Sequence, residues 1–250
     1  MKHDLVWLWL IPATVIIMAS ILFRFSALDI NVLKTLCLQH WIDFRLNPVW
    51  QFLYHYGNIV PGLIGLGGLL AVVVSFWSRS YLSLRKPGLF LVLMLLVGPG
   101  LVVNVLFKDN WGRPRPYETQ LFGGDKEYLR LFDKGTPGNG ASFPSSHAAM
   151  GFFVCAPFFL FWARGRKRLA AMIFCVGFVY GTVIGFARIT MGAHFPSDVL
   201  WAWAFTYMTG VALYYCFGFH RSGETSGSWF SNQSVTSAIR VATEEPELPH

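Results

Sequence analysis

The sequence predicts an all-α membrane protein: a six-transmembrane helical bundle with one interfacial amphipathic helix and one long outer loop. Of the 250 residues, 54% are hydrophobic and only 13% are charged, whereas about a quarter of the residues in an ordinary soluble domain are charged. The apolar residues also gather in blocks of roughly 20, the length that a helix needs to cross a hydrocarbon core about 30 Å thick. The six blocks are Leu5–Phe23, Asn58–Trp77, Gly88–Phe107, Ser146–Ala163, Leu169–Ile189 and Asp198–Phe217.

The first block is interpreted as a retained membrane span. It is longer than the apolar region of a signal peptide, and no small-residue cleavage site follows it before Arg24. The next segment, 28–56, mixes apolar residues such as Leu33, Trp41 and Phe44 with charged ones such as Asp29. This mixture predicts an amphipathic helix in the outer interface, with aromatic rings at headgroup depth. An ordinary connecting loop is the alternative.

The net charge of +7 is placed in a way that indicates membrane topology. Loops 78–87 and 164–168 contain seven cations and no acid: Arg79, Arg85, Lys86, Arg164, Arg166, Lys167 and Arg168. These loops are the second and fourth connections, so they lie on one side, which the positive-inside rule assigns to the cytoplasm. Both termini then face the cytoplasm, and the first, third and fifth connections face outward. The basic charge therefore gives no reason to expect a nucleic-acid partner.

Four other features of the sequence are an interrupted span, a long loop, a polar tail and the cysteines. Gly98-Pro99-Gly100 interrupts the third span, where proline removes a backbone hydrogen bond. The connection 109–142 is long, polar and rich in glycine, which favours a functional loop. The tail, 220–250, contains few apolar residues and is expected to be disordered in the cytoplasm. The four cysteines show no paired spacing, so they predict neither a disulfide framework nor a zinc site.

The first of three polar segments closes the third span. Lys108, Arg113 and Arg115 lie within eight residues of one another and are followed by Pro116. They fall on the outer side, so they are not positive-inside anchors. A rigid basic clamp for phosphate explains them. The alternative is that long cationic side chains reach out to lipid headgroups.

The second polar segment opens the fourth span. Pro144 beside Ser142, Ser145 and Ser146 is typical of a helix start. Free backbone N–H groups and the helix dipole make such an end an anion site. His147 lies in the first turn of this helix. Taken alone, a histidine at the end of a span is more often an ordinary interfacial residue than a catalyst.

The third polar segment joins the fifth and sixth spans and contains Arg188, His194 and Asp198. His194 and Asp198 are four residues apart, so one helical turn brings them to the same side. A carboxylate there can accept the imidazole N–H, fix the tautomer and leave the other nitrogen as a nucleophile. The alternative is a structural His–Asp pair that caps the sixth helix.

All three segments fall on the outer face when six spans alternate in direction. They then form one site with at least three cations, two histidines and one carboxylate. Polar groups at membrane depth are costly and usually functional. Three independent structural explanations would be needed to replace a single functional one.

These residues resemble the type 2 phosphatidic acid phosphatases, which share their site with vanadium haloperoxidases. The family signature is Lys, six residues, Arg-Pro; then Pro-Ser-Gly-His; then Ser-Arg, five residues, His, three residues, Asp. The sequence matches it in order and spacing, over roughly residues 50–217, with Ser146 in place of the glycine and Ala187 in place of the serine. A membrane lipid phosphatase domain is therefore expected over 1–219, with its catalytic core at about 50–217.

The resemblance implies a role for each matched residue. His194 attacks phosphorus, Asp198 orients it, and His147 protonates the leaving alkoxide and then activates water. The phosphate oxygens are held by Lys108, Arg115, Ser145, Arg188 and backbone N–H groups near Ser146, and Arg113 is a further candidate contact. No metal and no cofactor are expected, because the sequence contains no carboxylate cluster to hold a metal.

The substrate is left open among several lipid phosphates. Phosphatidic acid or phosphatidylglycerophosphate, undecaprenyl diphosphate and lipid A phosphates all fit, and Phe122-Gly123-Gly124 faintly resembles lipid A 1-phosphatases. Membrane lipids are the expected partners, and no obligatory protein partner is evident. The expected location is a bacterial inner membrane with the active site facing the periplasm. A small transporter would need polar groups near mid-span, and a haloperoxidase is expected to be soluble.

Overall fold

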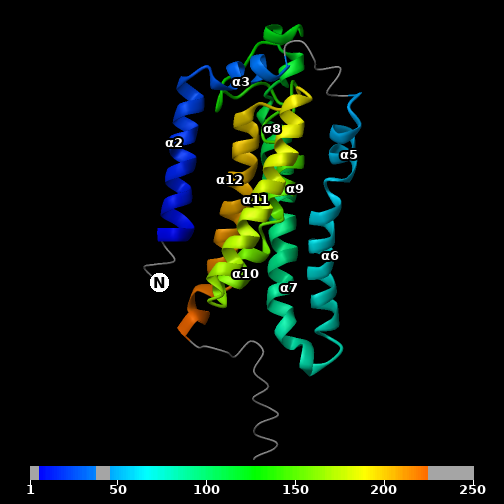
Figure 1. The fold of residues 1–250 in the computed structure, drawn as a ribbon, viewed down its shortest axis with the longest axis vertical. Coiled ribbons are helices and arrows are strands. Elements are labelled where there is room, and N and C mark those ends of the chain that lie inside the picture. The colour runs from blue at the N-terminus through cyan, green and yellow to red at the C-terminus, as the bar shows by residue number, and fades with distance from the viewer. Residues whose placement is uncertain (1–5, 38–45, 225–250) are drawn as a thin grey trace, which may run out of the picture.

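The computed structural model describes residues 6–37 and 46–224, which form a bundle of helices (Figure 1). No β-strand occurs in these ranges, so the all-α prediction is confirmed for them. The α-helices are α2 (Ile11–Phe25), α3 (Leu28–Cys37), α5 (Pro48–Tyr56), α6 (Ile59–Val74), α7 (Leu82–Leu95), α8 (Asp109–Trp111), α9 (Ser146–Phe153), α10 (Pro157–Ala163), α11 (Lys167–Thr190) and α12 (Pro196–Cys216). π-Helical segments are η1 (Val6–Leu10) and η3 (Leu96–Lys108), and 3-10 turns are η2 (Arg79–Tyr81), η4 (Pro116–Glu118), η5 (Gln120–Phe122) and η6 (Phe219–Glu224).

Five helical segments in the described part of the chain are long and apolar enough to cross a membrane. They are Val6–Phe25, Pro48–Val74, Arg79–Glu118, Ser146–Ala163 and Lys167–Thr190. The sixth predicted span forms α12, whose 21 residues extend about 31 Å at 1.5 Å per residue. Indole and phenol side chains such as Trp203 and Tyr207 make α12 more polar than the other spans. Both are buried, because α12 packs against α7, η3, α9 and α11 in the middle of the bundle.

The second span begins earlier than the sequence indicates. Asn47 caps α5 by accepting a hydrogen bond from the Val49 backbone N–H at 2.9 Å, and Pro48 occupies the first turn. After a turn at Gly57, the chain continues as α6, so residues 48–56 belong to the span and not to an interfacial helix. The expected interfacial helix is represented by α3 alone, and Trp41 and Phe44 lie outside the described residues.

The glycine–proline run changes the winding of the third span. The chain passes from α-helical to π-helical at Leu96, and this segment contains Pro99 and ends at Lys108. The Asn104 side chain donates a hydrogen bond to the Pro99 carbonyl at 2.8 Å. Because proline disturbs the backbone ladder, a wider helix with a side-chain bond across it is a consistent outcome. Such segments are frequent at functional sites.

Small residues allow close helix packing beside the site. A Cβ added to Gly151 of α9 would lie 2.9 Å from the Cα of Gly181 of α11. A Cβ added to Gly185 of α11 would lie 2.3 Å from a methyl carbon of Val199 in α12. These approaches hold α9, the second half of α11 and the start of α12 together. The close contact of glycine faces is typical of helices that pack within lipid.

The two ends of the bundle differ in what they carry. Figure 1 shows α3, α8 and the connection 109–142 at the upper end, and the α6–α7 and α10–α11 turns at the lower end. Gly112 has φ +71° and packs against Thr136, so the long connection folds back on itself. At the lower end, the chain leaves α12 and forms the 3-10 turn Phe219–Glu224, in which Phe219 is buried. Most of the tail predicted to be disordered, 225–250, lies outside the described residues.

Candidate active site

The three polar segments meet at the upper end of the bundle, as the alternation of spans predicts. Lys108, at the end of η3, donates a hydrogen bond from Nζ to the Ser146 hydroxyl at 2.9 Å. That hydroxyl donates in turn to the Asn104 side-chain oxygen. The hydroxyl that replaces the family's glycine therefore fixes the lysine ammonium at the start of α9.

The start of α9 has the geometry of an anion site. Ser145 is the N-cap, with its hydroxyl 3.4 Å from the Ala148 backbone N–H. The Ser145 backbone N–H donates to the Asp198 carbonyl at 3.2 Å, which ties the second polar segment to the third. A helix N-terminus carries free N–H groups and a positive dipole. Lys108 adds its charge at the same place.

His194 is buried, with 1% of its surface exposed. Its Nδ1 lies 2.6 Å from the Ser142 carbonyl oxygen and 3.9 Å from the nearer Asp198 carboxylate oxygen. A carbonyl oxygen only accepts, so Nδ1 carries the proton and Nε2 keeps its lone pair. The predicted direct hydrogen bond from His194 to Asp198 is not formed. The Ser142 carbonyl takes its place at Nδ1, and the Ser142 hydroxyl donates to Asp198, so Ser142 contacts both residues.

The environment favours the neutral form of His194. Burial lowers the pKa of His194 well below its usual value, and the positive charges of Arg188 and Lys108 lower it further. The hydrogen bond to Ser142 acts in the opposite direction and is outweighed. A neutral imidazole with an available Nε2 is the form that a nucleophile requires.

Asp198 holds the backbone around His194 and does not touch the imidazole. Its Oδ2 accepts hydrogen bonds from the Ser142 hydroxyl at 2.6 Å and from the Phe195 N–H at 2.8 Å. The Phe195 bond closes the first turn of α12. The carboxylate therefore positions the Ser142 carbonyl, which in turn sets the tautomer of His194. Asp198 is thus connected to His194 through Ser142, and its orienting role stays a prediction.

Arg113 lies behind the site and not in it. Its side chain is fully buried and is paired with two carboxylates, Asp198 at 2.6 Å and Asp29 of α3 at 3.0 Å. It also donates to the Ser197 hydroxyl at 2.8 Å and to the Leu129 carbonyl at 3.0 Å. The expectation that Arg113 is a further phosphate contact is wrong. Its side chain is buried, and all three guanidinium nitrogens already donate to these acceptors.

A pocket of about 280 Å³ opens at this end of the bundle, lined by Tyr54, Arg115, Tyr117, Arg188, Met191 and Ala193. The Arg188 guanidinium carbon lies 4.7 Å from the centre of the Tyr54 ring. The His147 ring stacks on the same tyrosine at 5.0 Å. Arg115 donates to the Tyr117 hydroxyl at 3.2 Å. The pocket thus combines two guanidinium groups with aromatic walls, next to the His194 segment.

The structure brings the predicted site residues to one end of the bundle and adds others. Asp29 and Tyr54 were missed because they lie in the segment interpreted as interfacial. The available signal for Asp29 was an acid at the first turn of an otherwise mostly apolar run, 28–33. Asn104 was a polar residue inside a predicted span, which is itself an indication of function. Within 6–37 and 46–224, no three His, Cys, Asp or Glu side chains gather closely enough to hold a metal ion.

The fold and the site together define a phosphatase embedded in a membrane. The profile of the PAP2 superfamily matches residues 87–222, which is more than half of the chain. The chain belongs to this superfamily, as the resemblance in its three motifs indicates.

Named relatives narrow the class to lipid phosphatases. The chain is 35% identical over 165 residues to a lipid A 4′-phosphatase of Francisella tularensis subsp. novicida (strain U112), covering 65% of this chain and 73% of the relative. It is 34% identical over 121 residues to a lipid A 4′-phosphatase of Rhizobium leguminosarum, covering 48% of this chain and 50% of the relative. No solved structure matches the chain.

Proposed function

We propose that the protein removes the phosphate of a lipid A-type glycolipid through a covalent phosphohistidine at His194. The observation that carries the proposal is the tautomer of this residue. Nδ1 is held by the Ser142 carbonyl at 2.6 Å, so Nε2 is the nitrogen left for attack. The cations of Lys108, Arg115 and Arg188 then stabilise the charge on the phosphoryl oxygens.

The reaction proceeds in two balanced steps. His194 Nε2 forms a bond to phosphorus while the bond from phosphorus to the lipid oxygen breaks, and His147 in its protonated form gives the leaving oxygen its proton. His147 then takes a proton from water, whose oxygen attacks the phosphohistidine. The P–N bond breaks, inorganic phosphate leaves, and both histidines regain their starting states. No step requires a metal.

The substrate class follows from the relatives and the pocket. The named relatives act on the 4′-phosphate of lipid A, and the 280 Å³ pocket has Tyr117 and Met191 in its wall. Apolar and aromatic walls suit the face of a sugar ring, and the two guanidinium groups suit its phosphate. We therefore favour the 4′-phosphate over the 1-phosphate, phosphatidic acid, phosphatidylglycerophosphate and undecaprenyl diphosphate.

The proposed location is the inner membrane, with the site at its periplasmic face. The support is the cationic loops at the opposite end of the bundle, because cations gather on the cytoplasmic side. A lipid held by its own chains reaches the site by lateral diffusion.

Trapping of the intermediate tests the mechanism. Purified protein mixed with ³²P-labelled lipid A and rapidly denatured should carry label that is stable to alkali and lost in acid, as a phosphohistidine is. The His194→Ala variant should carry none, and the His220→Ala variant, changed at the other end of the bundle, should label like the wild type. Label on the His194→Ala protein would refute the assignment.

A substrate panel tests the lipid. The purified protein in matched micelles should release phosphate from lipid A labelled at the 4′-position much faster than from lipid A 1-phosphate, phosphatidic acid or undecaprenyl diphosphate. Glucose 6-phosphate is the water-soluble control. Equal rates on the sugar phosphate and on every lipid would overturn the lipid assignment and leave the histidine mechanism standing.

A further inference from the structure

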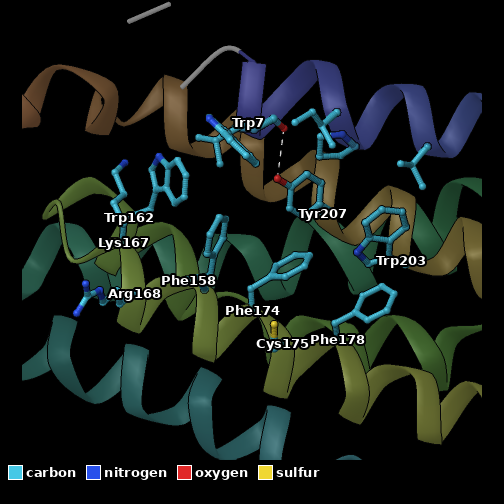
Figure 2. Close-up of a pocket in the computed structure, with 15 residues that line it drawn as sticks. Trp7, Phe158, Trp162, Lys167, Arg168, Phe174, Cys175, Phe178, Trp203 and Tyr207 are labelled. Atoms are coloured by element: carbon cyan, nitrogen blue, oxygen red, sulfur yellow. Dashed lines mark hydrogen bonds between the residues drawn. The ribbon is translucent and has the colours of Figure 1, made fainter. Parts of the chain in front are cut away.

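A second cavity lies at the end of the bundle away from the proposed active site. Its volume is about 730 Å³, and it lies between the first membrane segment, η1 and α2, and the helices α10, α11 and α12. Figure 2 shows Trp162, Lys167 and Arg168 at one end and Phe178 and Trp203 at the other. Apolar and aromatic side chains form nearly all of the wall between these ends.

The groove and the proposed active site are lined by opposite ends of α11. Arg188, at the end of α11, lines the phosphate pocket, whereas Lys167 and Arg168 begin the same helix. Phe178 is eleven residues beyond Lys167, or about 16 Å at 1.5 Å per residue. The groove therefore occupies the half of the membrane that the proposed active site does not reach. It is an independent feature of the molecule.

The wall of the groove indicates what can fill it. The groove follows α11 for about 16 Å, and its lining side chains between the two ends are apolar or aromatic. Extended hydrocarbon chains suit such a wall, and the groove lies between segments that are themselves apolar enough to cross a membrane.

The charged end identifies the headgroup. Lys167 and Arg168 both line the groove, and none of its lining residues in the described part of the chain, 6–37 and 46–224, is acidic. The Lys167 ammonium lies 3.5 Å from the centre of the Trp162 ring, which holds it at the mouth of the groove. Basic pockets between membrane helices favour anionic lipid headgroups. Two adjacent cations above an apolar slot match a phosphate that carries two acyl chains.

We propose that this groove binds an anionic glycerophospholipid of the leaflet opposite the active site. Its phosphate lies at Lys167 and Arg168, and its acyl chains extend toward Phe178 and Trp203. The bound lipid fills the space between the first membrane segment and the rest of the bundle. It thereby stabilises the packing of α2, which leads directly into α3 and so to Asp29.

Native mass spectrometry of the purified full chain tests the charged end, with phosphatidylglycerol and phosphatidylcholine as probes. The wild type should retain phosphatidylglycerol preferentially. The Lys167→Gln/Arg168→Gln variant should bind it roughly 30-fold more weakly. The Arg79→Gln/Arg85→Gln variant, which removes two cations from the other loop at the same end, should bind it like the wild type. Equal retention of the two lipids, or equal loss in both double variants, would overturn the proposal.

A variant that fills the groove tests the apolar part. Ala171 lines the groove, and its neighbour Met172 is 65% exposed on the outer surface of α11. Ala171→Phe should abolish the rise in melting temperature that added phosphatidylglycerol gives the wild type, and Met172→Phe should preserve it. Retained phosphatase activity would show that Ala171→Phe is folded. A full lipid-induced rise in that variant, or a change in its oligomeric state with no change in bound lipid, would contradict the proposal.

Discussion

At the scale of single residues, the feature that organises the site is a charged side chain that never reaches the substrate. Arg113 is completely buried and pairs with Asp29 and Asp198. Buried ion pairs add little net stability, but removal of one partner leaves an uncompensated charge that costs about 3–5 kcal/mol. Asp198 also holds the Ser142 hydroxyl. Arg113 is thus linked to His194, the proposed nucleophile, through two intermediate residues, Asp198 and Ser142.

This arrangement predicts the effect of replacing Arg113. Arg113→Leu should destabilise the protein by about 3–5 kcal/mol, and Arg113→Lys, which keeps the charge without the planar fork, should destabilise it less. Unfolding followed by loss of tryptophan fluorescence in detergent measures both. The control is Arg130→Ala, an exposed position in the same long loop. Identical melting of the Arg113→Leu and Arg130→Ala proteins would disprove the supporting role.

The lowered pKa of His194 predicts a dependence of stability on pH. The folded protein binds a proton at His194 less readily than the unfolded chain, whose histidine has a pKa near 6.5. The contribution of this residue to stability is therefore complete above about pH 6.5 and declines as the pH falls toward the folded-state value. The positive charges of Arg188, Lys108 and Arg115 all act on the ring in the direction that lowers its pKa.

Melting temperatures of the wild type and the His194→Gln variant between pH 8 and pH 5 measure this effect. Glutamine does not titrate, so the wild type should lose more stability than the variant on acidification. All other groups are shared, and the difference between the two curves isolates His194. Parallel curves would show that the pKa of His194 is unperturbed in the folded protein.

At the scale of elements, the π-helical segment Leu96–Lys108 connects an interruption in the sequence to the site. Pro99 disturbs the ladder, Asn104 bonds the Pro99 carbonyl, and Asn104 also accepts the Ser146 hydroxyl that holds Lys108. The interruption was visible in the sequence as a glycine–proline run. Its connection to Ser146 was not visible, because the two residues are 42 positions apart and only the bundle brings them together.

Asn104→Leu should therefore lower kcat/KM strongly while it leaves the stability of the fold much less affected. Loss of a buried hydrogen-bond partner costs about 1–3 kcal/mol, so kcat/KM should fall roughly 5- to 150-fold as Lys108 loses its fixed position. The matched control is Asn110→Leu, an exposed residue of α8, just after the π-helical segment, whose side chain donates to backbone carbonyls. Equal kinetics in the two variants would remove Asn104 from the support of the site.

The interfacial segment shows where a prediction from sequence patterns fails. Residues 28–56 were grouped as one interfacial segment because apolar and charged side chains mix within them. The structure divides them into α3, with Asp29 and Leu33 buried, and α5, which extends the second span and places Tyr54 in the pocket. Burial of an isolated acid depends on a partner 84 residues away, Arg113, which no local pattern reveals.

At the scale of the whole molecule, the alternating direction of the spans was the main basis for predicting where the site lies. Six apolar blocks and two cationic loops were sufficient to place all three polar segments at one end, which is where they lie. The segments come from the ends of different helices, and the number of crossings alone determines which ends meet. The sequence did not indicate the groove beside α2, because its walls are ordinary apolar residues.

Reporter fusions test the orientation of the whole protein in the membrane. A cytoplasmic reporter fused after Glu224 should be active, and a periplasmic reporter inserted near Gly138 should be active too, because seven cations lie in the two loops at the opposite end. Exchange of the two reporters should silence both. Activity only in the exchanged arrangement would place the site on the cytoplasmic face.

The ion pair between Arg113 and Asp29 sets a limit on how far this enzyme can be shortened. The superfamily profile begins at residue 87, but Asp29 and Tyr54 come from segments that precede it. A fragment cut to the profile would keep both histidines and the three cations that are proposed to bind phosphate. It would nevertheless leave a buried guanidinium group with half of its countercharge and a pocket with one wall open to lipid. A minimal engineered version must therefore retain the first two membrane segments, even though neither contains a signature residue.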